Sequence, residues 1–274
     1  MALVGTSNTQ KQINNTHISM KKINLLGLLL ITISWPTLAK PSPYYYEMRV
    51  YRFANEAQKK IVEDYWQSAG VPALNRLGIS TVGIFSEADQ KDGLKLYVLI
   101  PYKSLSQFEK LPNQLQADVA YQQTAKAYLD TDPASPAYDR YESSLGKAFR
   151  DWPVIKPTPL SGLKSSRVYE YRLYESHSEA KGQSKIDMFN QGGEINIFVR
   201  LGFNPVFFAQ TILGTKQPNL TYMTTFDNRE SRDAHWKAFG SDPEWNRIKV
   251  LPEYQKNMTK AEVHFLTPTE YSQI

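Results

Sequence analysis

The stretch that decides the fold is YEMRVYR at residues 46–52, which recurs as YEYRLYE at residues 169–175. Two further pairs repeat in the same way: LGISTVGIF at 77–85 with LGFNPVFFA at 201–209, and the segment 96–104 with 220–228. The displacement is 123 residues for the first pair and 124 for the other two. Matched segments at a constant displacement indicate an internal repeat, so the chain carries two copies of one unit.

The pattern within the first copy predicts the order β-α-β-β-α-β. Residues 45–53 alternate and are rich in strand-forming types, and apolar residues then recur at helical spacing until Gly78. The predicted elements are a strand at 45–53, a helix at 55–76, strands at 81–85 and 94–100, a helix at 105–129 with a break at Pro112, and a strand at 137–145.

The second copy predicts the same order. Its elements are a strand at 167–174, a helix at 179–201, strands at 206–211 and 219–226, a helix from 230 through 239 and beyond, and a strand at 261–266. Three prolines and one glycine between 151 and 162 indicate an ordered or polyproline-like connector. The predicted boundaries are 44–150 for the first unit, 151–165 for the linker and 166–274 for the second unit.

This element order predicts an α+β chain of two tandem ferredoxin-like units. A four-stranded sheet with both helices on one face needs cover on its other face. The two copies can cover each other as a pseudo-twofold dimeric α/β barrel. We expect a cavity at the seam between the two sheets. Such a pseudo-dimer needs no partner chain, and the oligomeric state stays open.

The composition excludes several functional classes. Residues 1–39 contain three lysines and no acid, which leaves 29 basic and 27 acidic residues in the remainder. This balance, without a Lys/Arg stripe, argues against a nucleic-acid partner. The absence of cysteine excludes disulfides, thiolate nucleophiles and Cys-ligated metals. Aromatic residues make up 12% of the chain, enough for both a core and a lined cavity.

The N-terminal 39 residues predict an extension with a Sec-type signal peptide. Lys21 and Lys22 precede the apolar run INLLGLLLITI at 23–33, and Thr37-Leu38-Ala39 supplies small residues for cleavage before Lys40. The run is shorter than the roughly 20 residues of a membrane span, so no stable anchor is expected after cleavage. We therefore expect a periplasmic or secreted protein. Met20 is the start codon that this pattern favours, and Met1 remains the alternative.

Three sequence features resemble a known family. The opening strands at 46–51 and 169–174, the stretch PALNRLG at 72–78, and SRDAHWKAF followed by DPEW at 231–245 are similar to the NIPSNAP family. The resemblance covers most of residues 44–274, although the first half lacks the Trp and Asp-Pro-x-Trp form of the second helix. It implies a dimeric α/β-barrel fold and no settled reaction, since this superfold hosts cofactor-free oxygenases, haem-modifying enzymes and isomerases.

The family motif residues are expected to be structural. Aromatic residues at this helical spacing usually form core, and Asp242-Pro243 is typical of a helix N-cap followed by proline at the first helical position. The set is Arg232, Trp236, Phe239, Asp242, Pro243 and Trp245.

The repeated strand supplies the candidate ligand-binding residues. Period-2 geometry places Glu47, Arg49 and Tyr51 on one face, with Glu170, Arg172 and Tyr174 on the equivalent face of the second copy. We expect these polar faces to point into the seam, and the alternate apolar face to lie under the helices. One interpretation is a pair of structural ion pairs between the sheets. The other is a polar floor that binds a ligand carboxylate or carbonyl.

No catalytic signature follows from the remaining residues. His177, His235 and His264 show no metal-ligand spacing, so neither a metal nor a cofactor is predicted. His235 could face a cavity as a haem ligand or general base, but a surface or hydrogen-bonded histidine is the simpler interpretation. No nucleophile can be assigned, and whether the chain is an enzyme stays open.

Three functional hypotheses remain. The first is an exported protein that binds a small, largely apolar molecule at the seam. The second is a cofactor-independent oxygenase or isomerase that uses the same cavity. The third is a protein-interaction module. A filled seam would disfavour both ligand hypotheses, whereas an open cavity with a tyrosine or histidine beside an arginine would favour the enzyme.

Overall fold

The computed structural model describes residues 41–89, 92–156 and 158–274; the predicted signal peptide at 1–39 lies outside them. The first repeat contains β1 (Tyr45–Phe53), α1 (Glu56–Tyr65), a π-helical turn (Trp66–Gly70), α2 (Val71–Arg76), β2 (Gly83–Glu87), β3 (Leu94–Tyr102), α3 (Leu105–Ala117), α4 (Val119–Thr124), α5 (Lys126–Leu129) and β4 (Arg140–Ala148). The second contains a short 3-10 turn (Lys164–Ser166), β5 (Val168–Glu175), α6 (Glu179–Phe189), α7 (Glu194–Arg200), β6 (Pro205–Leu213), β7 (Asn219–Phe226), α8 (Arg229–Ser241), α9 (Pro243–Ile248), a second 3-10 turn (Pro252–Tyr254) and β8 (Lys260–Pro268).

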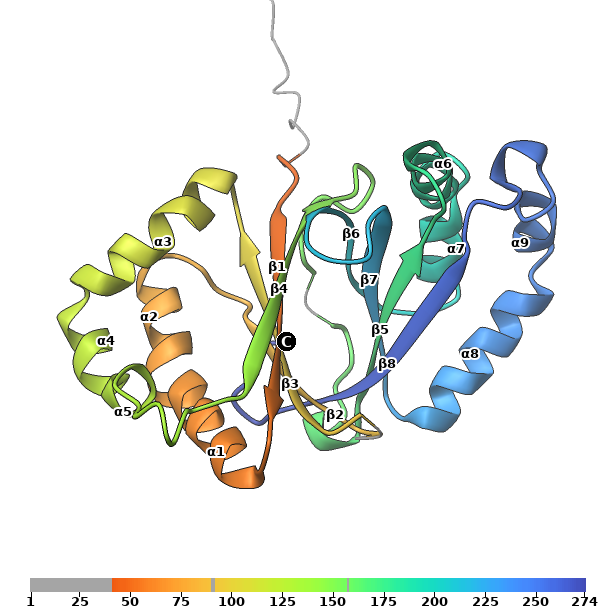
Figure 1. Ribbon diagram of the computed structural model, residues 1–274. Coiled ribbons are helices and arrows are strands. Elements are labelled where there is room, and N and C mark those ends of the chain that lie inside the picture. The colour runs from red at the N-terminus through yellow and green to blue at the C-terminus, as the bar shows by residue number, and fades with distance from the viewer. Residues whose placement is uncertain (1–40, 90–91, 157) are drawn as a thin grey trace, which may run out of the picture. The chain divides into compact units, whose positions relative to one another are not determined.

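The eight strands form one closed barrel in the order β1-β3-β2-β8-β5-β7-β6-β4. Within each unit the first strand lies between the third and the fourth, as in a ferredoxin-like sheet. Antiparallel pairing of β2 with β8 and of β4 with β6 joins the units. Helices α1–α5 cover one side of the barrel and α6–α9 the other (Figure 1). The predicted α+β fold of two ferredoxin-like units is confirmed.

The helices begin at capping residues that the sequence shows, but two of the long helices predicted from apolar periodicity are divided into shorter ones. The Asn55 side chain accepts a hydrogen bond from the Gln58 amide, and Ser104, Ser178 and Asn228 cap their helices in the same way. The predicted helix at 105–129 breaks at Asp118, which caps α4, and not at Pro112, which lies inside α3. The helix predicted at 179–201 ends before Gly193, which adopts a left-handed conformation with φ of 88°.

Apolar side chains form three cores. One lies between the first sheet and α1–α5, and a second between the second sheet and α6–α9. The third fills part of the barrel interior with rings and aliphatic side chains, including Tyr46, Phe85, Tyr169 and Phe207. The linker belongs to the fold, because Trp152 packs in the second core and its indole donates to the Val206 carbonyl.

Candidate functional site at the barrel mouth

The predicted polar face of β1 lies under the helices, which corrects the expected orientation. Tyr51 belongs to the helix-side core of the first unit, whereas Tyr46, Met48 and Val50 face the barrel interior. Both faces of a strand are buried when helices cover the outside of a closed barrel. Alternation therefore identifies two faces without showing which one is the interior.

Glu47 and Arg49 form a buried ion pair within the first unit. The Glu47 carboxylate accepts hydrogen bonds from Arg49 Nε at 2.5 Å, the Tyr102 hydroxyl at 2.7 Å and the Ser143 hydroxyl at 2.8 Å. Burial alone would raise the pKa of Glu47, but Arg49 and these donors outweigh burial and lower it. Each charge therefore has a partner nearby, which supports the interpretation as a structural ion pair. The pair lies within the first unit, however, and not between the two sheets.

The second unit uses different partners for the equivalent glutamate. Glu170 is fully buried and accepts two hydrogen bonds from Arg232 and one, at 2.7 Å, from the Trp236 indole. Arg172 lies 3.2 Å from the same carboxylate and over the Trp236 ring at 4.2 Å. Tyr174 accepts a hydrogen bond from Arg172 at 2.9 Å. These contacts explain the arginine and tryptophan of the helix motif.

The other motif residues make helix-cap and packing contacts. Asp242 caps α9 by accepting hydrogen bonds from the amides of Glu244 and Trp245, both at 3.0 Å. Phe239 packs on Trp245 with ring centroids 4.5 Å apart, and Pro243 is the first residue of α9.

A cavity of about 540 Å³ opens at one end of the barrel, next to the interior core, with which it shares Met48, Tyr97 and Tyr171. Apolar side chains form one part of its lining and ionisable side chains the other. Its main apolar residues are Met48, Val50, Tyr171, Leu173 and Val263, and its polar residues include Arg52, Asp92, Lys95, Tyr97, Glu142, Ser144, Thr215, Lys216, Glu262 and His264.

One wall of this cavity holds a connected group of titratable side chains. His264 Nδ1 lies 2.7 Å from Glu87 Oε1, and the Tyr97 hydroxyl lies 3.2 Å from both atoms. Lys95 Nζ is 3.1 Å from the other Glu87 oxygen and 3.5 Å from Asp92. Burial acts to raise the pKa of Glu87, but contacts with His264 and Lys95 lower it to about 2. Burial and the Glu87 carboxylate raise the pKa of Tyr97.

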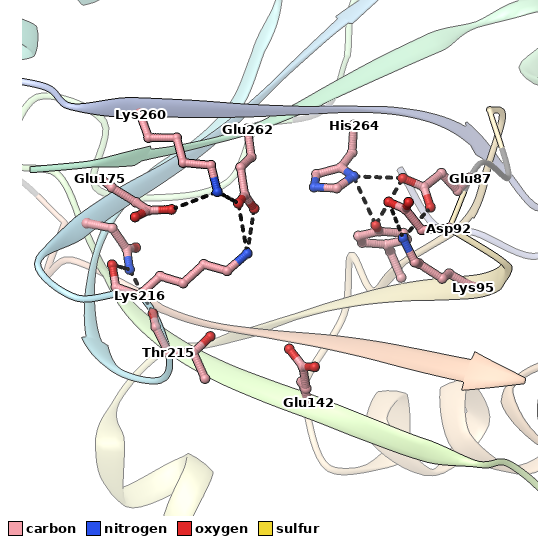
Figure 2. A network of polar contacts seen from close by, with 12 residues as sticks. Glu87, Asp92, Lys95, Glu142, Glu175, Thr215, Lys216, Lys260, Glu262 and His264 are labelled. Atoms are coloured by element: carbon pink, nitrogen blue, oxygen red, sulfur yellow. Dashed lines mark hydrogen bonds and ion pairs between the residues drawn. The ribbon is translucent and has the colours of Figure 1, made fainter.

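A second group lies beside it along β8 (Figure 2). Lys216, from the β6–β7 connection, lies 2.9 and 2.7 Å from the two Glu262 oxygens. Lys260 contacts Glu262 at 2.6 Å and Glu175 at 3.6 Å. Burial acts to raise the pKa of Glu262, but the two lysines outweigh this effect and lower it.

A larger hollow of about 600 Å³ lies at the other end of β4. Its lining includes the exposed side chains of Lys147, Arg150, Gln183, Gln191 and Gln210. No buried titratable group lines it within the described ranges, so the barrel mouth is the stronger candidate. Across residues 41–89, 92–156 and 158–274, no group of three or more His, Asp or Glu side chains could hold a metal ion.

Sequence reasoning missed the barrel-mouth site. Glu262 and His264 alternate on a predicted strand, which was the available signal that both share a face. Glu87, the partner of His264, and Lys95, which pairs with Glu87, come from the other unit, however, and only barrel closure brings them to His264. His177 is exposed, and His235 is half-buried with Nδ1 2.6 Å from the Ser231 carbonyl, as the simpler interpretation expected.

The NIPSNAP family model matches residues 46–131 and 169–273, thus both repeats. The chain belongs to the NIPSNAP family. No curated protein matches it. Among the described residues of this NIPSNAP protein, no helix has the length and apolar character needed to cross a membrane.

Two solved structures with a TM-score above 0.5 share the barrel fold at low sequence identity. A candidate monooxygenase from Lactobacillus acidophilus is 9% identical with a TM-score of 0.55, over 83% of this chain and 94% of that one. A candidate monooxygenase from Fusobacterium nucleatum is 12% identical with a TM-score of 0.53, over 84% and 94%. A NIPSNAP-like domain protein from Burkholderia xenovorans is 17% identical with a TM-score of 0.36, over 39% and 90%. At these identities the likeness concerns the fold alone.

Proposed function

We propose that this NIPSNAP protein binds a small amphipathic molecule in the barrel-mouth cavity. The observation that carries the proposal is an interior space of about 540 Å³ that the aromatic core leaves open. Cavities of roughly 300–1,000 Å³ are the usual size of small-molecule sites. This cavity supports the seam site that the sequence led us to expect.

The lining favours a ligand with one apolar and one polar side. Met48, Val50 and Leu173 offer aliphatic surface, and Tyr97 and His264 offer hydrogen-bonding groups. The sequence suggested a largely apolar ligand, but the ionisable wall would be costly to cover with hydrocarbon, since buried polar groups need partners.

The charges of the lining favour a neutral or dipolar ligand. Lys95 pairs with Glu87 and Asp92, Lys216 with Glu262, and Arg52 with Glu142 at 3.6 Å. Each cation therefore already faces a carboxylate. A nucleotide or another polyanion would have to compete with these carboxylates, so neither is proposed.

Native mass spectrometry of the purified mature protein tests this function. We expect a co-purifying small molecule in the native chain and its loss in Leu173→Trp, which fills the cavity. Ile212→Trp, at an exposed position of β6, is the matched control and should retain the molecule. Equal retention of the molecule by both variants would count against the proposal. So would the absence of a bound molecule in the native chain, if the chain also failed to bind nitrobenzotriazole, a small aromatic probe with one polar side.

We also propose that this binding takes place outside the cytoplasm. The basic residues, apolar run and small residues before Lys40 support export.

A further inference from the structure

The His264 imidazole presents one nitrogen to a carboxylate and the other to the cavity. Nδ1 lies 2.7 Å from Glu87, whose pKa of about 2 keeps it ionised at neutral pH. An ionised carboxylate only accepts hydrogen bonds, so Nδ1 carries the hydrogen and donates it. In the neutral ring, Nε2 then holds a free lone pair.

That lone pair is available to a bound molecule. Nε2 has no hydrogen-bond partner within residues 41–89, 92–156 and 158–274, and in Figure 2 it points away from Glu87, toward Lys216 and Glu262. The His264 side chain is 22% exposed, which leaves it accessible from the cavity.

The ring is held in this orientation by its neighbours. Tyr171 stacks on His264 with ring centroids 6.0 Å apart and planes inclined by 27°, and the Tyr97 ring lies at 5.6 Å. Glu87, in turn, is fixed by Lys95 and the Tyr97 hydroxyl. A base whose orientation is set by a third group is the general form of a proton-transfer site.

We propose that His264 acts as a general base that removes a proton from a carbon acid bound in the cavity, with Glu87 as its positioning residue. This inference rests on the proposed function, because the substrate must first bind there. The substrate class is an enolisable carbonyl compound. In a β,γ-unsaturated member of this class, the α C–H proton moves to Nε2, the C–H electron pair delocalises through the carbonyl and the double bond as a dienolate, and the proton returns from Nε2 to the γ carbon. The reaction is an isomerisation: no atom is gained or lost, and it needs no oxidant or other co-reactant.

Lys216, on the side toward which Nε2 points in Figure 2, can receive the enolate charge. An ammonium group has three N–H donors, and the two contacts of Lys216 with Glu262 use at most two of them. A cationic donor facing a developing oxyanion stabilises it most when water is excluded. The titratable groups around His264 are Glu87 on β2, Lys95 and Tyr97 on β3, Tyr171 on β5, and Glu262 on β8.

The Kemp elimination of nitrobenzisoxazole tests the base directly. In this reaction the base takes the ring C–H proton, the electron pair forms a nitrile, and the N–O bond breaks to release a coloured cyanonitrophenolate. We expect the wild-type protein to accelerate the reaction and His264→Gln to lose about 10²-fold or more of that rate. Binding of nitrobenzotriazole, an unreactive analogue, is measured by calorimetry in parallel and should still be detected in this variant, because the apolar lining remains.

Two further variants separate positioning from stability. Glu87→Gln should lower the turnover number by about 10-fold or more while leaving nitrobenzotriazole affinity intact, because the ring loses its fixed tautomer. His177→Gln removes an exposed histidine and should change nothing. If wild-type and His264→Gln react equally, the base is wrong. Retained nitrobenzotriazole binding would then leave the proposed function standing, and absent binding would count against both.

Discussion

Glu170 on β5 and Arg232 on α8 are joined by two parallel hydrogen bonds, from Nε and Nη2 to opposite carboxylate oxygens, at 2.9 and 2.7 Å. This two-point geometry is the strongest form of an arginine–carboxylate contact. It ties the motif helix of the second unit to the centre of its sheet, since β5 pairs with both β7 and β8.

Removing the arginine should therefore destabilise the fold. Arg232→Met leaves Glu170, which is fully buried, with a smaller set of partners. We expect a loss of about 3 kcal/mol in the free energy of unfolding, at the lower end for a broken buried pair because Arg172 and Trp236 remain. Urea unfolding monitored by circular dichroism measures it.

Two controls identify the cause. Arg247→Met removes an exposed arginine and should cost little. The double variant Glu170→Gln with Arg232→Met should recover part of the loss, because no buried charge is left unpaired. A single variant as stable as the wild type would contradict the structural role of the motif.

The two equivalent glutamates show how far the sequence could predict the site. Repetition of the strand motif predicted Glu–Arg ion pairs between the sheets, whereas the pairs lie within each unit. It could not show that Glu47 relies on Tyr102 and Ser143 where Glu170 relies on Arg232 and Trp236. Such partners come from elements whose packing depends on the whole unit.

Fold and site differ in what determines them. Element order follows from local periodicity and from caps such as Ser178, so it could be predicted. Barrel closure brings Glu87 and His264 together although they lie 177 residues apart in the chain. Local patterns carry no information on such a pairing. Both faces of β1 are buried, so no difference in exposure between them showed which face is the barrel interior.

Acid should weaken the fold partly through Glu87. Its pKa in the folded state, about 2, lies below the ordinary value of 4.5, so its contribution is present above pH 4.5 and disappears as the pH falls toward 2. We expect a contribution on the order of 2 kcal/mol at neutral pH, less than the full shift because solvent screens a cavity mouth. Urea unfolding at several pH values between 7 and 2 measures it.

The comparison with Glu87→Gln isolates this residue from the other carboxylates. The variant should be less stable than the wild type at neutral pH, and the difference should shrink as the pH falls. Glu56→Gln, at an exposed site, should follow the wild-type curve. A difference that stays constant over the whole range would contradict the assignment.

Asp242 should matter through its cap and not through catalysis. Asp242→Ala removes the acceptor for two amides of α9 and should cost about 1–2 kcal/mol of unfolding free energy. Asp242→Asn keeps a capping oxygen but loses the 2.8 Å ion pair with Arg200, so we expect a smaller loss. Thermal unfolding of both variants checks the order, and equal losses would show that the ion pair, not the cap, is decisive.

Export predicts a defined mature terminus. The Thr37-Leu38-Ala39 sequence should be cut after Ala39, because signal peptidase requires small residues at the third and first positions before the cut. N-terminal sequencing of the protein recovered from the periplasm or medium should therefore begin at Lys40. Ala39→Phe should block cleavage and leave the precursor, whose intact mass also distinguishes a start at Met1 from one at Met20. A mature protein that begins before Lys40, or normal processing of the variant, would remove the basis for export.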